Sequence, residues 1–205
     1  MQLPEFYSRV PRIALRDPLA GFLGAATDGI LEYGYEDAVK LAGHSCPTVA
    51  SAWMLGCHAL HALYPGELPE RGGVRVAFAS RFDEGTTGVV ASIVTLLTGA
   101  AQGGGFKGLA GKYVRRDLLS FSEPLPLNLR FTRLDNGQAV DALADLARIP
   151  SDPETPILMG ACLRGEADEA MMRRFGLLWQ ERVKRILIDH GEDPEVFIIR
   201  PAPPV

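Results

Sequence analysis

The chain has 205 residues, a formal net charge of −4, and 47% hydrophobic residues. This length predicts a single domain, residues 1–205, that can bury a core without disulfide or metal staples. The charges are interspersed and form no basic face, so nucleic acid is not an expected partner, and no apolar run is long enough to span a bilayer.

The number of cysteines and the N-terminal residues both favour a cytoplasmic location. The three cysteines, Cys46, Cys57 and Cys162, form no C-x-x-C pair, which excludes a four-cysteine zinc module and fits a reducing environment. Residues 1–21 lack the charged, apolar and cleavage regions of a signal peptide. We therefore expect a cytoplasmic protein that does not associate with membranes.

The first third of the chain predicts helices. Asp17-Pro18 is typical of an N-cap followed by a first-turn proline, and it opens a short helix through residue 26 within an N-terminal helical segment of about residues 1–32. The core of the domain, about residues 33–190, follows this segment. It begins with a predicted helix over 35–42 that Gly43 ends, and a second over 47–64.

The middle of the chain predicts a sheet interrupted by one helix. Residues 87–98 are apolar nearly all round, which predicts a buried helix, and the glycine-rich segment 99–111 predicts a loop. Asp135-Asn136-Gly137 is a strong hairpin signal. Alternation predicts strands at 74–79, 118–122, 127–134 and 138–143.

The last part of the chain predicts a long helix between two strands. The apolar run 157–163 predicts a strand, and residues 166–190 place apolar side chains at helical spacing, in a stripe typical of core or dimer contacts. The tail, 191–205, predicts an edge strand at 196–199. Together the elements predict an α+β fold with a largely antiparallel sheet, packed with helices, and a long C-terminal helix.

The segment Gly43-His44-Ser45-Cys46-Pro47 is the strongest chemical signal. Cys46 precedes a first-turn proline, so it lies at a helix N-terminus, where free N–H groups favour a thiolate. Thiolate and imidazole are ligands that zinc and similar metals prefer, and a thiolate can also act as a nucleophile. A purely structural role, with a buried cysteine and a histidine that caps the backbone, is the remaining interpretation.

A zinc site needs three or four protein ligands, so His44 and Cys46 need others. Asp83 and Glu84 are candidates for a third ligand or a general base, or they cap the following helix. Cys57 would lie about 16 Å along the helix from Cys46, too far to share one ion. We expect structural or surface roles for Cys57, His58, His61 and Cys162.

The glycine-rich loop offers a second candidate site. It fails the phosphate-loop pattern, because Phe106 stands at the first glycine position and Tyr113 replaces Ser or Thr. Its backbone N–H groups, with Lys107, Lys112 and Arg115, would suit a small anionic ligand such as a carboxylate or phosphate. A surface hairpin with solvated charges is equally consistent with this pattern.

The His-Cys-Pro segment resembles the G-H-x-C-P segment of the formylmethanofuran dehydrogenase FmdE family. Downstream, Leu97-Thr98-Gly99, Gly111-Lys112 and residues 118–121 are similar to that family's T-G…G-K segment and following strand. The resemblance covers about residues 33–190. It fits a divergent bacterial-type member, because the chain lacks the C-terminal zinc ribbon that many members carry.

The resemblance implies an α+β metal-binding domain, often dimeric, with His44 and Cys46 as metal ligands. The chain departs from the family pattern at Ala42, Thr48 and Ser92, near which members commonly carry His, Gly, and Cys with Asp. We expect a homodimer that binds zinc or another divalent transition metal at this site. The alternatives are a metal-free enzyme with Cys46 as its catalytic nucleophile, and a non-catalytic accessory protein.

Overall fold

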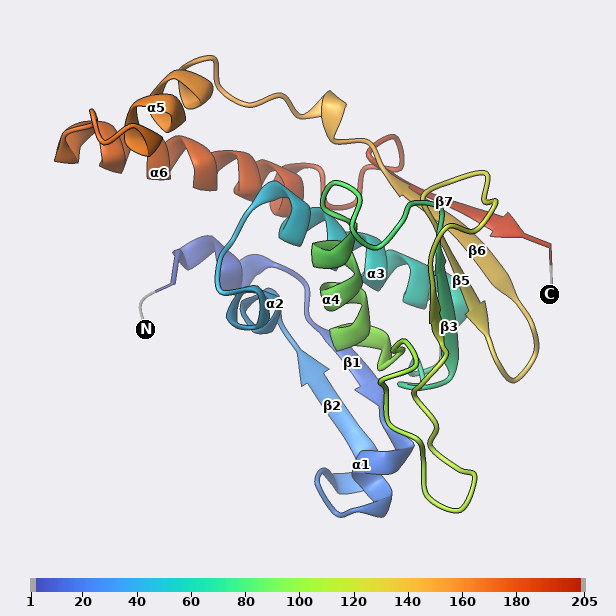
Figure 1. Cartoon of the computed structure of the whole chain (residues 1–205). Coiled ribbons are helices and arrows are strands. Elements are labelled where there is room, and N and C mark those ends of the chain that lie inside the picture. Colours follow the sequence, from blue (N-terminus) through green and yellow to red (C-terminus); the bar gives the residue numbers. More distant parts are fainter. Residues whose placement is uncertain (1–2, 204–205) are drawn as a thin grey trace.

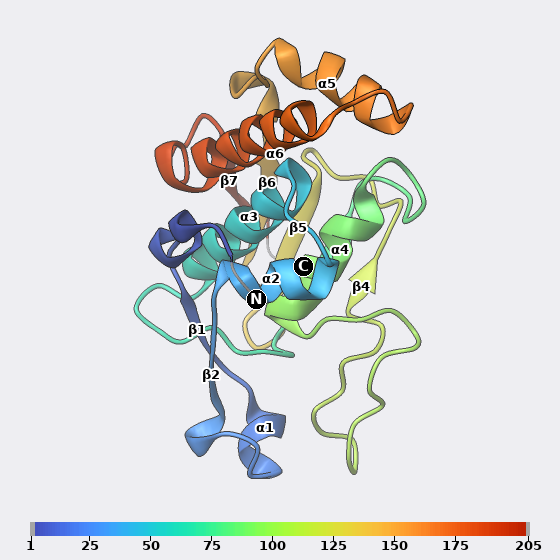
Figure 2. The same ribbon diagram turned by 90° about the vertical axis from the view of Figure 1, so that its left-hand side faces the viewer.

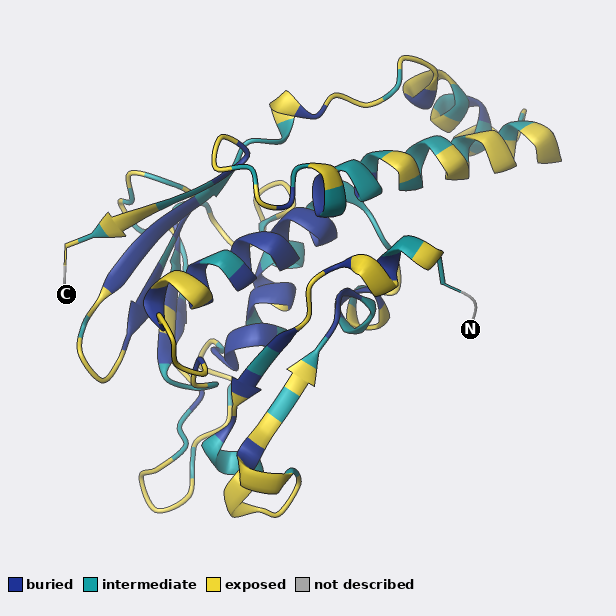
Figure 3. Cartoon of the chain, turned by 180° about the vertical axis from the view of Figure 1, so that it is seen from behind, coloured by how far each residue is buried: buried dark blue, intermediate teal, exposed yellow. Residues whose placement is uncertain are grey.

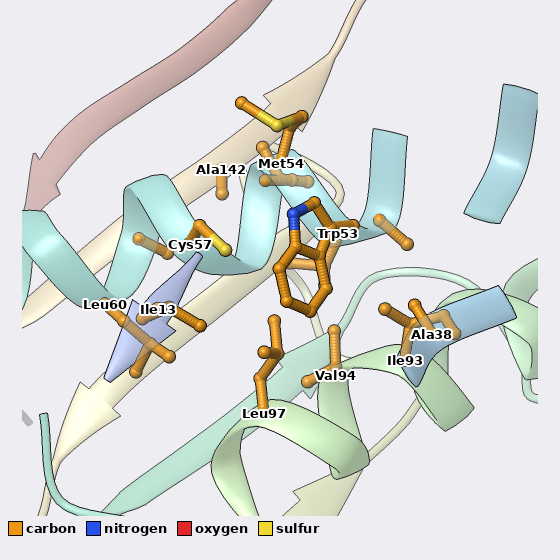
Figure 4. Packing of buried hydrophobic residues seen from close by; sticks show 14 of the residues in the cluster. Ile13, Ala38, Trp53, Met54, Cys57, Leu60, Ile93, Val94, Leu97 and Ala142 are labelled. Atoms are coloured by element: carbon orange, nitrogen blue, oxygen red, sulfur yellow. The ribbon is translucent and has the colours of Figure 1, made fainter. Parts of the chain in front are cut away.

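The fold is organised around one helix that is buried on nearly every side. Helix α3 (Pro47–Leu63) has 12 of its 17 residues buried, and it lies between the main sheet and helix α4 (Thr87–Thr98) (Figure 1). The computed structural model, which describes residues 3–203, places Trp53 and Leu97 at this contact (Figure 4). Gly56 permits the close approach, because a Cβ there would lie 2.6 Å from the Leu97 side chain.

A five-stranded sheet covers one side of α3. Its strand order is β4-β3-β5-β6-β7, and every neighbouring pair is antiparallel except β3 with β4. The predicted α+β fold and hairpin are confirmed, with Gly137 at positive φ in the turn between β5 and β6. The strands are β3 (Val74–Phe78), β4 (Leu119–Ser120), β5 (Leu129–Arg133), β6 (Ala139–Ala144) and β7 (Phe197–Ala202).

The N-terminal segment differs from the helical prediction for residues 1–32. Strands β1 (Ile13–Arg16) and β2 (Ile30–Tyr33) pair into an antiparallel ribbon at the side of the molecule (Figure 2). Ile13 and Leu15 point into the core, and a two-residue apolar alternation is too short to distinguish a strand from a helical turn. The helical parts of this region are η1 (Glu5–Arg9), α1 (Pro18–Phe22) and η2 (Thr27–Gly29), followed by α2 (Tyr35–Ala42).

The strand predicted for residues 157–163 is wrong, because this segment lies within helix α5 (Glu154–Leu163). Asp152 starts the helix by accepting the N–H of Glu154 with its side chain, and α5 packs on α6 (Glu169–Lys184). The two helices form a hairpin that extends away from the sheet, with exposed faces visible in Figure 3. After η3 (Leu146–Arg148) the chain enters this hairpin, and the π-helical turn η4 (Arg185–Asp189) continues α6.

No helix within residues 3–203 has the length and apolar character needed to cross a membrane.

The Asp17 carboxylate joins three segments of the chain. It accepts the N–H groups of Leu19 and Ala20 at the start of α1, and it binds Arg71 at 2.9 Å and Arg115 at 2.7 Å. Its side chain is only 6% exposed. Burial raises the pKa of Asp17, but the Ala20 N–H and the two guanidinium groups outweigh this effect and bring the pKa below its usual value.

Asp17→Asn is expected to lower the free energy of unfolding by about 3–5 kcal/mol at neutral pH, because the buried Arg115 and the partly buried Arg71 lose their shared anion. The native pKa is depressed, so the carboxylate's contribution is present above about pH 4 and is lost as the pH falls through the native pKa. Urea unfolding of both proteins across this range should show their difference shrinking at acid pH. A constant difference would contradict the electrostatic explanation.

Candidate functional site

The loop that carries the His-Cys-Pro segment is held in place at Ser45. The Ser45 hydroxyl lies 2.8 Å from the Tyr35 hydroxyl, at the start of α2. The Ser45 carbonyl accepts hydrogen bonds from Trp179 Nε1 at 3.0 Å and from Gln180 Nε2 at 3.3 Å, both on α6. Helices α2 and α6 therefore fix the backbone between the two candidate side chains.

His44 is exposed and has a defined tautomer when it is neutral. Its Nδ1 lies 2.9 Å from the carbonyl oxygen of Ala42, which can only accept, so Nδ1 carries the proton and donates it. The Nε2 lone pair is then the free ring acceptor. His44 lines a cavity of about 460 Å³. The cavity-lining residues are Leu41, Ala42, His44, Phe82, Asp83, Gly85, Gly88, Val89 and Ser92.

Cys46 occupies the predicted position at the N-terminus of α3. Its Sγ accepts the N–H of Val49 at 3.4 Å, so the thiol caps the helix. The side chain is half-buried and packs against the hydrophobic core. Of the two motif side chains, only His44 lines the cavity, and the structure therefore gives the two residues different surroundings.

Asp83 shares the cavity with His44, as a third-ligand role would require. Arg81 binds both of its carboxylate oxygens, at 3.0 and 2.9 Å, and this pairing lowers the pKa of Asp83. Glu84 instead accepts the backbone N–H of Arg81 at 3.2 Å, so it binds the loop before α4 and does not cap that helix as expected. Ser92 also lines the cavity, with its hydroxyl donating to the Gly88 carbonyl.

No group of three or more His, Cys, Asp and Glu side chains that could hold a metal ion lies within residues 3–203. His44 has the Asp83 carboxylate in its own cavity and the Cys46 thiol two residues along the chain. Only two of these three donors, His44 and Asp83, line the same cavity, which is fewer than the three or four protein ligands of a zinc site. The described residues of one chain therefore do not form a complete zinc site on their own.

The structure gives the predicted anion-binding side chains different surroundings. Arg115 is buried and binds Asp17, which places its charge inside the protein. Lys107 and Lys112 are exposed on the glycine-rich loop, where the backbone of Leu109 and Lys112 pairs. Arg115 Nη2 binds a carboxylate 98 residues earlier in the sequence, whereas its buried Nη1 has no hydrogen-bond partner within residues 3–203.

The other cysteine and histidine side chains considered in the sequence analysis do not line the His44 cavity. Cys57 is buried, and burial raises the pKa of its thiol. His58 Nε2 lies 2.6 Å from the Gly191 carbonyl oxygen, and His61 is exposed. Cys162 lies on α5, where it is partly exposed, and not on the predicted strand.

A larger cavity, of about 630 Å³, lies on a different part of the molecule and was not predicted. Its walls include Tyr64, Glu67, Arg133 and Asp135, which come from distant parts of the sequence and carry no shared motif. Arg133 binds Asp135 and Glu67 and lies 3.9 Å from the centre of the Tyr64 ring. These charges satisfy one another, so the cavity offers no unpaired group of this set to a ligand.

The chain has a distant similarity to a protein of known structure. No family model matches the chain, and no curated protein matches it. Among solved structures, it is similar to a tungsten formylmethanofuran dehydrogenase FmdE-like protein from Syntrophus aciditrophicus, with 18% identity and a TM-score of 0.40. That similarity covers 83% of this chain and 72% of the other, and at this level it assigns neither a ligand nor site residues.

Alkylation of the native protein should distinguish the three cysteines. Cys57 is expected to resist iodoacetamide, because it is buried and its raised pKa keeps the thiol protonated, whereas the partly exposed Cys46 and Cys162 react. Peptide mass spectrometry after timed labelling would measure the three rates, with urea-unfolded protein as the control. Labelling of Cys57 as fast as Cys162 in the folded protein would contradict this assignment.

Proposed function

We propose that the chain binds a divalent transition metal, zinc or a similar ion, at the His44 cavity, as the resemblance to the FmdE family implies. The observation that carries the proposal is the hydrogen bond from His44 Nδ1 to the Ala42 carbonyl. Metal-binding histidines usually donate their second ring N–H to such an acceptor, which fixes the ring and leaves the other nitrogen for the metal. His44 has this arrangement at the wall of a cavity.

Two other side chains would serve as donors. Cys46 lies at the N-terminus of α3, where a thiolate is favoured, and Asp83 lines the same cavity as an ionised carboxylate. Asp83 would have to exchange its contact with Arg81 for the metal. A site with so few protein donors keeps positions open, where a bound metal would polarise a small ligand or activate water.

We also propose a homodimer in which a second copy covers the cavity and contributes to the site. Leu41 and Phe82, at the cavity wall, are 52% and 51% exposed, which is unusual for large apolar side chains gathered at one place. Further exposed apolar side chains lie on the α5–α6 hairpin: Ile157, Leu163, Met172 and Leu177.

Metal content provides the test. Elemental mass spectrometry of tag-free protein should find near-stoichiometric metal that is lost in His44→Ala, because the imidazole is the central donor. Cys46→Ala and Asp83→Asn then test the other two donors. A variant that also loses metal identifies its residue as a further donor. His61→Ala removes an exposed histidine elsewhere on α3 and should behave like the unmodified protein.

Sedimentation of the same samples would measure their association state. Protein that purifies without metal, takes up no Zn²⁺ on titration and remains folded would contradict the metal proposal. A monomer at all concentrations, with or without Zn²⁺, would contradict the proposed dimer.

A second candidate is a metal-free site in which Cys46 acts as a nucleophile. The observation that favours it is the hydrogen bond from Val49 N–H to Cys46 Sγ, since a donor at a helix N-terminus stabilises a thiolate. Metal-free protein should then alkylate at Cys46 several times faster than at Cys162, which is also partly exposed. Equal rates would leave Cys46 with a capping role only.

A further inference from the structure

A small cavity lies between α5 and α6, at the base of the helical hairpin, and both apolar and polar side chains line it. Its volume is about 170 Å³, and most of its exposed lining is apolar. By comparison, an apolar cavity of about 150 Å³ can hold a benzene molecule. The lining residues are Ser151, Thr155, Pro156, Met159, Leu178, Trp179 and Arg182.

Arg182 brings a positive charge to this cavity without a compensating carboxylate. Its Nε donates to the Ile149 carbonyl at 2.8 Å and its Nη2 to the Leu146 carbonyl at 3.4 Å. In the described part of the chain, Arg182 takes part in no ion pair, in contrast to Arg130, Arg133 and Arg174. Burial and the neighbouring Arg185 lower the pKa of Arg182, so the surroundings disfavour its charge.

Thr155 lines the same cavity and contains an unsatisfied polar group. The residue is only 5% exposed, and its hydroxyl has no hydrogen-bond partner within residues 3–203. A buried hydroxyl without a partner destabilises a folded protein, and such groups are uncommon in native structures. An unpaired cation therefore lines the cavity, and an unpaired hydroxyl with almost no accessible surface lies within its wall.

We propose that this cavity binds a small organic carboxylate with an apolar body about the size of a benzene ring. The carboxylate would pair with Arg182, and it would accept a hydrogen bond from Thr155 after rotation of that side chain about χ1 turns the hydroxyl toward the cavity. The body would lie among the apolar side chains of Pro156, Met159 and Leu178, beside the Trp179 ring. Such a ligand satisfies both unpaired groups and fits the volume.

This site is separate from the His44 cavity but shares a structural element with it. Trp179 lines the α5–α6 cavity, and its Nε1 donates to the Ser45 carbonyl at 3.0 Å. A ligand that packs against Trp179 therefore contacts the side chain that holds the loop before α3. The proposal does not depend on metal binding at His44.

Titration with benzoate and with 3-methylbutanoate tests the proposal. The readouts are the ¹⁵N–¹H signal of the Trp179 indole and the ¹³C-methyl signal of Met159, while Trp53 and Met172 serve as internal controls away from the cavity. Saturable shifts at Trp179 and Met159 are expected. Benzamide, which has the same shape without the charge, should bind about 10-fold more weakly or not at all.

Three variants locate the binding groups. Arg182→Gln should weaken benzoate binding by about 10- to 100-fold, and Thr155→Val by about 3- to 10-fold. Arg185→Gln removes a neighbouring cation that does not line the cavity, and it should leave the affinity unchanged. Thr155→Val keeps the shape of the side chain and removes the unpaired hydroxyl, so the ligand-free variant should unfold at the same or a higher temperature.

Four results would overturn the proposal. The first two are the absence of a saturable shift with either acid, and binding of benzamide as tight as that of benzoate. The third is that Arg185→Gln weakens benzoate binding as much as Arg182→Gln does. The fourth is that Thr155→Val binds benzoate as tightly as the unmodified protein. The last variant keeps the test valid if Arg182→Gln fails to fold through loss of its contacts with Ile149 and Leu146.

Discussion

The burial of α3 is the constraint on which the rest of the structure depends. Strand β6 and helices α2 and α4 all pack against this helix, so neither end of it can move without disturbing the core. Its first residue, Pro47, follows directly after the His44–Cys46 segment, and the polar groups of Ser45 bind α2 and α6. The position of the candidate site is therefore a consequence of core packing, and the loop itself needs little intrinsic stability.

Local signals account for the parts of the fold that the sequence predicts well. Gly43 and Gly99 end α2 and α4 at positive φ, and Pro47 begins α3, because each of these residues restricts or permits a backbone conformation by itself. Helix α5 and the β1–β2 ribbon lack such signals, since their apolar residues are compatible with either conformation until a neighbouring element is present. The sequence likewise indicates His44 and Asp83 as candidate site residues, and both line one cavity. It cannot show that Arg115 binds Asp17, because this contact forms only when two distant segments pack together.

The His44 cavity and the α5–α6 cavity are linked by one side chain, Trp179. Its indole forms part of the wall between α5 and α6, and its N–H fixes the Ser45 carbonyl beside His44. Trp179 also lies between the exposed hairpin and the part of the chain that enters the core, since Leu177 is exposed whereas Val183 at the end of α6 and Ile186 in η4 are buried. The hairpin therefore cannot shift at its base without changing a hydrogen bond of the candidate site.

The edges of the main sheet restrict how chains can associate. Strand β4 at one edge has only two residues, and β7 at the other contains Pro201, which has no N–H to offer an incoming strand. Growth of the sheet from molecule to molecule is therefore disfavoured at both ends. An assembly that does not extend the main sheet relies on side-chain contacts, so its specificity can change through surface substitutions that leave the backbone of the fold untouched.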